Sequence, residues 1–447
     1  MLSLRTHHPY SGTEEMMATK LERIAEISAQ TAKPVFTSLY HLIDADLLKK
    51  CFKELDGKKA VGIDEVTKEE YGRQLDSNIA DLVKRLKNKS YKPMPTKRVF
   101  IPKGNGKLRP LGIASFEDKI VQLALKKVLE AVYEPRFLNC MYGFRPKRGC
   151  HEAVKDVYQH TSRGKINFIV DADVKGFFDH IDHEWMMKFL EWHIKDPNIL
   201  WLIRKYLKAG VMVDGMFEET EEGTIQGGNI SPTLANIYMY NVLALWFMIV
   251  VRKEVKGDCF LVNYADDFVA GFQYKSDAEK YYIALKERMA KFNLELEESK
   301  SRLIEFGRYA EQNRKAKGLG KPETFDFLGF TFFMGKSRRG YPCPMVKTSR
   351  KKFEKSLKNF KRWLYENKEQ PAGMLVKQLN VKLVGYYRYY GVTFNSYKLK
   401  AFLHRVQQFL HKAMNRRGCR RTYTWNGFID MLKVYPLAQP KIYYALY

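Results

Sequence analysis

The chain has 447 residues, of which 45% are hydrophobic and 14% aromatic. These values exclude wholesale disorder, and the length predicts about two to four structural units. The formal net charge of +27 indicates a polyanionic partner. The six cysteines are scattered without a C-x-x-C pair, which argues against a zinc ribbon or a disulfide framework and favours a reducing compartment.

The positive charge is concentrated in the last quarter of the chain. Residues 331–447 contain 25 lysines and arginines against 4 acidic residues, a net charge of +21, whereas residues 1–330 carry only +6. Aromatic residues such as Trp363, Tyr365 and Tyr386 alternate with these cations. A solvated basic surface over an aromatic core would explain the aromatics but not the charge, so the pattern favours nucleic-acid binding.

The first 113 residues predict helices followed by a basic hairpin. Residues 1–66 have a helical pattern with a break at Pro34, and a capping box at 67–70 (TKEE) opens a further helix. That helix has an apolar face made of Leu75, Ile79, Leu82, Val83 and Leu86. Two strands at 98–102 and 107–113 then flank the turn KGNG. The glycines allow close backbone approach, and the tip cations Lys103, Lys107 and Arg109 suit a phosphate chain.

A helix is expected from about 117 to 133, before Pro135, and a strand at 166–174. Alternation along the strand places its apolar and acidic side chains on opposite faces: Phe168, Val170 and Val174 against Asp171 and Asp173. A glycine-rich loop at 223–232 leads into the most apolar stretch, residues 234–251. Because Asn236 and Asn241 interrupt this stretch, we interpret it as a buried helix and not as a membrane span.

The segment NYADDFV at 263–269 is the most informative in the chain. Apolar runs at 260–262 and 268–270 predict two buried strands, and Asp266-Asp267 between them predicts a hairpin turn. Asp-Asp is a poor choice for a tight turn, and two adjacent anions repel each other. An unfavourable local choice in a consistent segment indicates a functional site. An aromatic strand at 325–332 follows, and from 349 the pattern predicts three basic helices divided near Pro371 and Asn395.

Asp173 and Asp266 lie 93 residues apart, with a glycine-rich loop between them and a basic hairpin upstream. Nucleotidyl transfer uses such parts. Two Mg²⁺ ions held by carboxylates activate a 3′-hydroxyl and stabilise the leaving pyrophosphate, and hard oxygen ligands suit Mg²⁺. Lys and Arg on a hairpin neutralise a triphosphate.

Six motifs then resemble, in order and spacing, those of reverse transcriptases encoded by bacterial group II introns. They are RPLGI at 109–113, YGFRP at 142–146, DVKGFFD at 173–179, QGG at 226–228 with ISP at 230–232, YADD at 264–267 and FLGF at 327–330. The upstream VGID at 61–64 resembles the extra N-terminal motif of that family. The downstream LVGYYRYY at 383–390 resembles its RNA-binding thumb, also called the maturase domain.

The resemblance implies an α+β, right-hand polymerase fold. It divides the chain into an N-terminal extension (1–66), fingers with part of the palm (67–165), a palm with an antiparallel sheet (166–335), and a basic helical thumb or maturase domain (336–417). The remaining 418–447 would be a tail with room for a minimal DNA-binding segment at most. No cysteine pairs mark a C-terminal endonuclease module, so second-strand cleavage is not expected.

The resemblance also implies roles for single residues. Asp173 and Asp266 would be the main metal ligands, assisted by Asp267 and the backbone carbonyl of Val174. Lys103 and Arg109 would hold the triphosphate, Gln226 would contact the incoming nucleotide, Phe178 would be the steric gate against ribonucleotides, and Lys300 would support the primer or the active-site carboxylates. Three alternatives stay open. Asp171 competes with Asp173, Phe178 could belong to the core, and Tyr386–Tyr390 could be thumb core or an RNA contact, with one pair facing inward and the other outward.

The implied activity is RNA-directed DNA synthesis with two Mg²⁺ ions and deoxynucleoside triphosphates. Expected partners are the RNA template, the group II intron RNA whose splicing and retrohoming the protein would promote, and a DNA target or primer. No membrane partner is expected, the setting would be the bacterial cytoplasm near the nucleoid, and a homodimer is left open. The alternatives are a domesticated reverse transcriptase in phage defence or repair and a non-catalytic RNA-binding splicing factor. A Phe at the gate position disfavours an RNA-dependent RNA polymerase.

Overall fold

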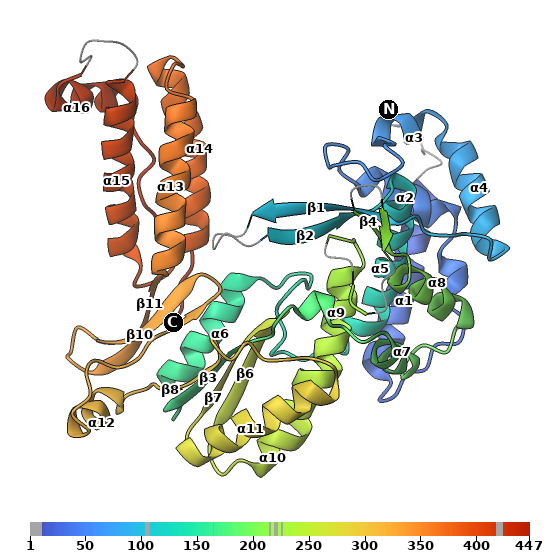
Figure 1. Cartoon of the computed structure of the whole chain (residues 1–447), viewed down its shortest axis with the longest axis horizontal. Coiled ribbons are helices and arrows are strands. Elements are labelled where there is room, and N and C mark those ends of the chain that lie inside the picture. Colours follow the sequence, from blue (N-terminus) through green and yellow to red (C-terminus); the bar gives the residue numbers. More distant parts are fainter. Residues whose placement is uncertain are drawn as a thin grey trace, which may run out of the picture.

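The computed structural model describes residues 11–102, 108–163, 165–213, 216–218, 222–224, 227–416 and 423–447, with backbone alone at 11–19, 109, 213, 216 and 217. Helices and three sheets alternate along the chain, so the α+β class is confirmed. Helices gather at the N-terminal end, an antiparallel sheet lies in the middle, and a second group of helices stands at the C-terminal end (Figure 1).

The N-terminal helices pack around one long buried helix. They are α1 Ser11–Gln30, η1 Tyr40–Leu42, α2 Ala45–Glu54, α3 Lys68–Arg73, α4 Leu75–Lys87 and the central α5 Phe116–Tyr133. The capping box at Thr67 is confirmed, since its side chain accepts from the Glu70 N–H and the Glu70 carboxylate accepts from the Thr67 N–H. The single helix predicted after it is wrong, because the chain breaks at Gln74 (φ −125°, ψ 40°) into α3 and α4.

The predicted basic hairpin forms an arm. Strands β1 Thr96–Pro102 and β2 Leu108–Ile113 pair antiparallel, with Arg98 opposite Gly112. The short strands β4 Val211–Val213 and β5 Met216–Glu218 complete this sheet in the order β2-β1-β4-β5. The arm projects from the N-terminal helices toward the C-terminal helices (Figure 1). Its tip, which carries Lys103 and Lys107, lies outside the described residues.

The middle sheet is antiparallel throughout, in the order β6-β7-β3-β8. Its strands are β3 Phe168–Asp173, β6 Cys259–Tyr264, β7 Asp267–Phe272 and β8 Arg302–Glu305. Alternation gives each face its own core. Val170, Ala172 and Phe268 join the N-terminal core, whereas Ile169, Val269 and Ile304 join a second core shared with the C-terminal helices. Helix α11 Lys275–Lys291 packs against β3 and β7, and α6 Cys150–Arg163 packs against β6 and β7.

The apolar stretch forms a helical run through the N-terminal core. Its parts are α9 Ser231–Met239, the π-helical turns η3 Tyr240–Ala244 and η4 Phe247–Val251, and α10 Arg252–Glu254. By length and composition alone, the run Ser231–Glu254 could cross a membrane, with a mean hydropathy of 1.8, but 67% of that window is buried inside the protein. It is the kind of buried helix that the sequence predicted, next to η2 Phe177–Asp179, α7 His183–Glu191 and α8 Pro197–Leu207.

The C-terminal part combines a three-stranded sheet with a helical bundle. The sheet has the order β11-β10-β9 and comprises β9 Phe325–Phe327, β10 Phe330–Lys336 and β11 Pro342–Thr348, preceded by α12 Ala310–Ala316. The predicted divisions of the bundle are confirmed in α13 Arg350–Glu366, α14 Ala372–Tyr390 and α15 Ser396–Met414, followed by α16 Trp425–Val434. The last residues return to the base of the bundle, where Tyr444 pairs with Val392 and stacks on His151 at 3.7 Å.

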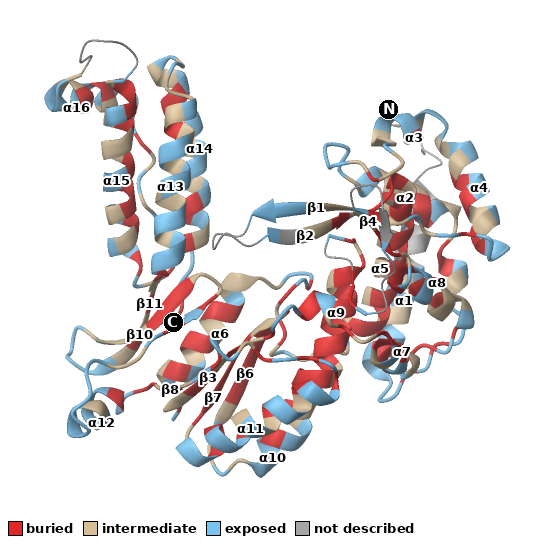
Figure 2. Cartoon of the chain, in the orientation of Figure 1, coloured by how far each residue is buried: buried red, intermediate tan, exposed pale blue. Residues whose placement is uncertain are grey.

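The inward-and-outward pairing expected of Tyr386–Tyr390 is wrong. Tyr386, Tyr387 and Tyr390 are all buried, and Tyr389 is partly buried. Tyr386 stacks on Phe402 of α15 at 3.7 Å. The helix has partners on two sides, the bundle and the β9–β10 hairpin, so a wider face is buried than a one-sided amphipathic helix would show. Buried residues run through both the bundle and the sheet (Figure 2).

A buried acid ties α5 to α8 and predicts a pH effect on stability. The Asp118 carboxylate accepts from the Tyr91 hydroxyl, the Ser115 hydroxyl (2.7 Å) and the Met94 N–H (3.0 Å). Burial nevertheless raises the pKa of Asp118 to about 6. The folded chain therefore holds a proton that the unfolded chain, with an Asp pKa of about 4, releases. This contribution to stability is complete below pH ~4 and is lost as the pH rises through ~6.

We expect the free energy of unfolding of the native chain to fall by about 3 kcal/mol relative to Asp118→Asn between pH ~4 and ~7. Asparagine keeps the shape of the neutral acid but does not titrate, so the comparison isolates this group. Denaturant unfolding at a series of pH values measures it. Parallel stability curves for the two proteins would contradict the assignment.

Candidate active site

The turn between β6 and β7 carries the central carboxylate in a strained backbone. Tyr264 pairs with Asp267, so the two turn residues are Ala265 and Asp266, and Asp267 is the first residue of β7. The predicted Asp-Asp turn is therefore wrong by one residue. Ala265 has a φ of 57°, which favours glycine. Such strain costs about 1–3 kcal/mol and persists where the surroundings enforce it.

The surroundings that enforce it come from the YGFRP segment. The Asn263 N–H donates to the Cys140 carbonyl (2.7 Å), and the Tyr142 N–H donates to the Asn263 carbonyl (2.8 Å). A Cβ on Gly143 would lie 2.6 Å from the backbone nitrogen of Ala265. The buried side chain of Asn236 donates to the Gly143 carbonyl at 2.7 Å. Asn236 is one of the two asparagines in the apolar helix. Gly143 is thus clamped between the apolar helix and the turn.

The turn opens into a polar cavity of about 610 Å³. Its lining residues are Asp171, Asp173, Asp266, Asp267, Ser299, Lys300, Arg302, Thr324, Asp326 and Lys351. Asp173 and Asp267 are cross-strand neighbours in the β3–β7 ladder, which brings residues far apart in sequence together. Asp171 and Asp173 line the same cavity, as the alternation of β3 predicted.

The crowded carboxylates raise one another's pKa. Burial, followed by the charges of Asp171, Asp266 and Asp173, raises the pKa of Asp267 to about 7. Burial and the charges of Asp326 and Asp173 likewise raise the pKa of Asp171 to about 7, against the opposing effect of Arg302. Burial is the larger cause of both shifts, and the repulsion between neighbouring carboxylates adds to it. A cation in the cavity would relieve that repulsion.

Three cations of the chain approach the acids. The Lys300 ammonium forms an ion pair with the Asp173 carboxylate, and this contact raises the pKa of Lys300. The Arg302 guanidinium lies 3.7 Å from the Asp171 carboxylate. Lys351 reaches the cavity from the first turn of α13. Five aspartates thus face three cations at the lining, and the local balance is acidic in an otherwise basic protein.

The FLGF turn connects the cavity to the C-terminal helices. Phe327 pairs with Phe330, leaving Leu328 (φ 49°) and Gly329 (φ 81°) as a two-residue hairpin turn of the type that needs two positive φ values. The Leu328 N–H donates to the Asp267 carboxylate and opposes the rise of its pKa. The Tyr389 hydroxyl of α14 donates to the Leu328 carbonyl at 3.0 Å. The bundle is therefore linked to Asp267 of the acidic cavity through one turn.

The donor set suits a hard divalent cation, because carboxylate oxygens are the ligands that Mg²⁺ prefers. In the part of the chain that the structure describes, no three His, Cys, Asp or Glu side chains are arranged closely enough to bind a metal ion. The Asp173 carboxylate instead contacts Lys300. Next to it, the bridge between Val174 and Leu296 is flanked by hydrogen bonds of the Asp173 carbonyl and the Lys175 N–H.

The other predicted site residues are only partly placed. Phe178 is 8% exposed, contacts Phe177 edge-to-face at 5.4 Å and belongs to the N-terminal core. Lys103 and Gln226 lie outside the described residues, as does the side chain of Arg109. Gly227 (φ +109°), which follows Gln226, has its Cβ position only 2.7 Å from the Gly112 carbonyl, so the glycine-rich loop lies against β2 of the arm.

Sequence reasoning missed several residues at the cavity and behind it. Asp326 lines the cavity from β9, and alternation between Phe325 and Phe327 was a signal that could have found it. The buried amide of Asn236 in an apolar helix was a second signal. Arg302 and Lys351 carried none, because their approach to the acids depends on the pairing of β8 with β3 and on the placement of α13.

Comparison with known proteins defines the class of this chain. The family model described as reverse transcriptase (RNA-dependent DNA polymerase) matches residues 101–332, just over half of the chain. The chain therefore belongs to this family. The match begins near the end of β1 and ends in β10, so it includes β2, the middle sheet, the FLGF turn and every residue that lines the acidic cavity except Lys351.

The chain is also similar in sequence to three named proteins. The chain is similar to the group II intron-encoded protein LtrA of Lactococcus lactis subsp. cremoris, with 37% identity over 224 residues, which are 50% of this chain and 37% of the relative. It is also similar to the protein YkfC of Escherichia coli K12, with 38% identity over 186 residues (41% of this chain, 49% of the relative). The nuclear intron maturase 1 of Arabidopsis thaliana is 33% identical over 93 residues, covering 21% of this chain and 13% of the relative. The chain spans half or less of the length of these relatives.

Proposed function

We propose that this protein is an RNA-directed DNA polymerase of the group II intron type and that the acidic cavity is its nucleotidyl-transfer site. The observation that carries the proposal is the meeting of Asp173, Asp266 and Asp267 in one cavity, through the pairing of β3 with β7 and a strained turn. Structural aspartates in a solvated turn would not need to be buried and crowded in this way, whereas here burial and the neighbouring charges raise the pKa of Asp171 and Asp267 to about 7.

The three regions fit the fingers, palm and thumb of a right-hand polymerase. The middle sheet would be the palm (166–335), the N-terminal helices and the β1–β2 arm the fingers (67–165), and the basic bundle the thumb (336–417). The N-terminal extension (1–66) would act as part of the fingers, because Phe36, Leu39 and Leu47 share the core that contains α5. The tail (418–447) would strap the thumb to α6, which packs on the palm sheet, through Tyr444 and His151.

Two Mg²⁺ ions would be held by Asp173, Asp266 and Asp267, with the Val174 carbonyl as a further ligand. When bound, the ions supply activation of the primer 3′-hydroxyl and stabilisation of the pyrophosphate leaving group. Lys300 neutralises Asp173 before the metal arrives, and it would have to release that carboxylate on loading. The Leu328 N–H keeps Asp267 oriented toward the cavity. Asp171, paired with Arg302, would tune the charge of the site without being a main ligand.

The incoming deoxynucleotide would lie between the arm and the palm. Lys103 and Arg109 would hold its triphosphate, and Gln226 would contact the nucleotide itself, on a loop whose next residue, Gly227, touches β2. Phe178 would exclude a 2′-hydroxyl at the edge of the site. Its present burial in the core beside Phe177 supports a rigid gate that cannot swing away from a ribose.

Phe178→Ala is expected to raise ribonucleotide incorporation about tenfold or more relative to deoxynucleotides, because the wall against the 2′-hydroxyl is removed. Primer extension with each nucleotide type measures this ratio. Phe177→Ala is the matched control, since it removes a neighbouring ring from the same core without opening the gate. Melting of both variants separates selectivity from destabilisation. Equal sugar selectivity in the native chain and Phe178→Ala would show that Phe178 is a core residue alone.

The basic bundle would bind RNA, both as template–primer and as intron RNA. Helix α13 exposes seven cations on its surface: Arg350, Lys351, Lys352, Lys355, Lys358, Lys361 and Arg362. We propose that this surface lets the protein act as a maturase that promotes splicing of its intron, and that primed reverse transcription at a DNA target then copies the intron. The similarity to the intron-encoded protein LtrA supports this setting over phage defence or repair. Whether the protein forms a homodimer stays open, because no contact among the described residues argues for one.

RNA binding is expected to weaken about 1000-fold between about 50 and 200 mM salt, because six or more phosphate contacts release their counterions. Fluorescence anisotropy with a labelled structured RNA measures the slope. The charge-reversed variant Lys355→Glu/Lys358→Glu is expected to show a shallower slope. A dissociation constant that does not change with salt would contradict the electrostatic role of α13.

The polymerase proposal is tested by primer extension with the native chain on an RNA template. We expect DNA synthesis with deoxynucleotides and Mg²⁺, none with EDTA, and little with ribonucleotides. Intact RNA binding without any extension would favour the non-catalytic splicing factor instead. Extension by the native chain without dependence on a divalent cation would overturn the role given to the acidic cavity.

A further inference from the structure

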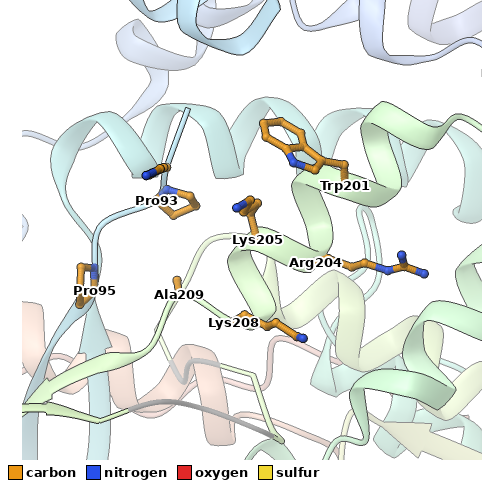
Figure 3. Close-up of a pocket in the computed structure, with 8 residues that line it drawn as sticks. Pro93, Pro95, Trp201, Arg204, Lys205, Lys208 and Ala209 are labelled. Carbon is orange, nitrogen blue, oxygen red and sulfur yellow. The ribbon is translucent and has the colours of Figure 1, made fainter. Parts of the chain in front are cut away.

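A second cavity lies in the N-terminal part of the chain. It has a volume of about 420 Å³, which is within the range of small-ligand sites. Its lining residues are Lys92, Pro93, Pro95, Trp201, Arg204, Lys205, Lys208 and Ala209. Figure 3 shows the two prolines on the segment that leads into β1, with Trp201, Arg204 and Lys205 on α8 and Lys208 and Ala209 just after it. We call this cavity the α8 cleft, and it shares no residue with the acidic cavity.

The floor of the cleft is apolar and includes one aromatic ring. Trp201 is partly buried against the N-terminal core, and its exposed part lines the cleft with Pro93, Pro95 and Ala209. An indole, two prolyl rings and a methyl group make up the apolar part of the lining (Figure 3). Such a surface suits a planar ring as its ligand, because aromatic stacking needs a pre-formed flat face.

Cations surround this floor. Lys92, Arg204, Lys205 and Lys208 are all exposed. Arg204 forms an exposed ion pair with Glu191 at 3.2 Å, whereas Lys92, Lys205 and Lys208 form no ion pair within the described ranges. Cations near the end of α8 also suit the helix dipole, which explains Arg204, Lys205 and Lys208 in part. The dipole does not explain Lys92, which belongs to the segment before β1, or the indole of Trp201 in the same lining.

The two walls of the cleft are fixed from below. The hydroxyls of Tyr91 and Tyr206 lie 2.6 Å apart, joining the residue before Lys92 to α8. Both the Tyr91 hydroxyl and the Met94 N–H donate to Asp118, which is buried in α5. The two backbone segments of the α8 cleft are therefore fixed relative to each other, and a ligand would bind without the cost of ordering them.

We infer that the α8 cleft binds an unpaired nucleotide of a single-stranded nucleic acid, with the base against Trp201 and the flanking phosphates at Lys205, Lys208 and Lys92. The partly exposed indole of Trp201 offers a stacking face for a base, and the neighbouring cations fit the phosphates. An acidic peptide would use the cations but would leave the indole and the prolyl faces without a matching group. This inference goes beyond the proposed polymerase function, because it adds a nucleic-acid contact outside the template–primer path.

The position of the cleft supports a separate contact. Helix α8 lies at the end of the molecule opposite the basic bundle, with the middle sheet between them (Figure 1). The acidic cavity is lined from that sheet, where β3 ends and β7 begins, and by Lys351 of the bundle. The segment of a nucleic acid that occupies the acidic cavity and the bundle would leave α8 uncovered. The cleft would therefore hold a distal segment of the same RNA or a second strand.

Photocrosslinking of the full chain tests the inference. The probes are an oligouridylate with one 4-thiouridine and an oligothymidylate with one 4-thiothymidine, each used with the template–primer path filled by an unlabelled RNA–DNA hybrid. We expect crosslinks in peptides covering 92–95 or 197–209. A preference for the RNA probe would assign the cleft to RNA, and equal labelling would assign it to either single strand. Labelling confined to other peptides with both probes would overturn the inference.

Variants define the contribution of each wall. Trp201→Leu, which keeps apolar packing but loses the stacking face, is expected to weaken binding of the oligouridylate about tenfold. Lys205→Glu/Lys208→Glu is expected to weaken it at least as much. The matched controls are Trp192→Leu, an exposed indole after α7, and Lys280→Glu/Lys291→Glu on α11, which change the same residue types elsewhere.

Primer extension at saturating template–primer should be unchanged in Trp201→Leu, and its melting temperature shows whether it folds. Absence of primer extension by the native chain would refute the polymerase proposal but not the inference about the α8 cleft. If the native chain, the cleft variants and the control variants all bound the oligouridylate with equal affinity, the inference that the α8 cleft binds a nucleotide would be refuted. If an acidic peptide protected Lys205 and Lys208 from acylation and neither oligonucleotide did so, the inference would be overturned in favour of a protein partner.

Discussion

Replacing Asp266 by Asn is expected to lower RNA-templated nucleotide addition about 1000-fold while leaving the fold intact. Asp266 is in the turn between β6 and β7 and lines the cavity with Asp173 and Asp267. Loss of its charge removes ligand charge where the catalytic cations would bind. The same loss relieves repulsion on Asp267, so the metal-free variant should melt at the same or a slightly higher temperature.

Single-turnover extension and thermal melting on the same preparations measure the two effects. Asp258→Asn is the matched control, because Asp258 is an exposed aspartate just before β6 and outside the cavity. It should leave extension unchanged. Activity retained by Asp266→Asn would contradict the assignment of the cavity, and a lower melting temperature would contradict the crowding of its charges.

Gly143→Ala is expected to lower nucleotide addition about 100-fold through displacement of the turn. The new Cβ would lie 2.6 Å from the Ala265 nitrogen and 3.0 Å from the Tyr264 carbonyl carbon, both of them backbone atoms that cannot rotate away. Ala265 and the adjacent Asp266 must then shift, and a displacement near 1 Å at a reacting centre costs about two orders of magnitude in rate. Gly143 acts as a positioning residue and does not touch the reacting atoms.

The change should appear in the rate of addition and not in the affinity for template–primer, which a purely structural defect would also reduce. Gly320→Ala provides the control, because a Cβ there meets no atom within 4 Å. Native-like rates in Gly143→Ala would show that the turn tolerates movement, and the clamp by Asn236 and Gly143 would then have no catalytic meaning.

Local patterns predicted the strands that build the site. The apolar runs around Asp266 correspond to β6 and β7, and the alternation of β3 correctly placed Asp171 and Asp173 on one face. These predictions succeed because strand formation and side-chain alternation depend on nearest neighbours in the chain. The turn register failed by one residue, since pairing with the 140–143 segment makes Ala265 adopt a positive φ that its sequence alone disfavours.

The other features that the sequence did not predict depend mainly on packing between elements that are distant in the sequence. The break at Gln74 comes two residues after Gly72, which was the only local signal for it. The burial of Tyr386, Tyr387 and Tyr390, with partial burial of Tyr389, needed the β9–β10 hairpin as a second partner for α14. Arg302 and Lys351 reach the acids only through sheet order and the placement of α13. Sequence periodicity contains no information on which distant element packs on which face, so these residues could not be assigned to the site.

The central claim is that the acidic cavity holds the catalytic cations, and Mn²⁺ binding tests it most directly. Mn²⁺ accepts the same carboxylate ligands as Mg²⁺ and is counted by electron paramagnetic resonance. The titration uses the native chain and Asp173→Asn/Asp266→Asn, each bound to a chain-terminated primer on RNA with the next deoxynucleotide. We expect two tightly bound ions in the native complex and loss of at least one in the variant. Equal number and affinity of bound Mn²⁺ in both complexes would contradict the account.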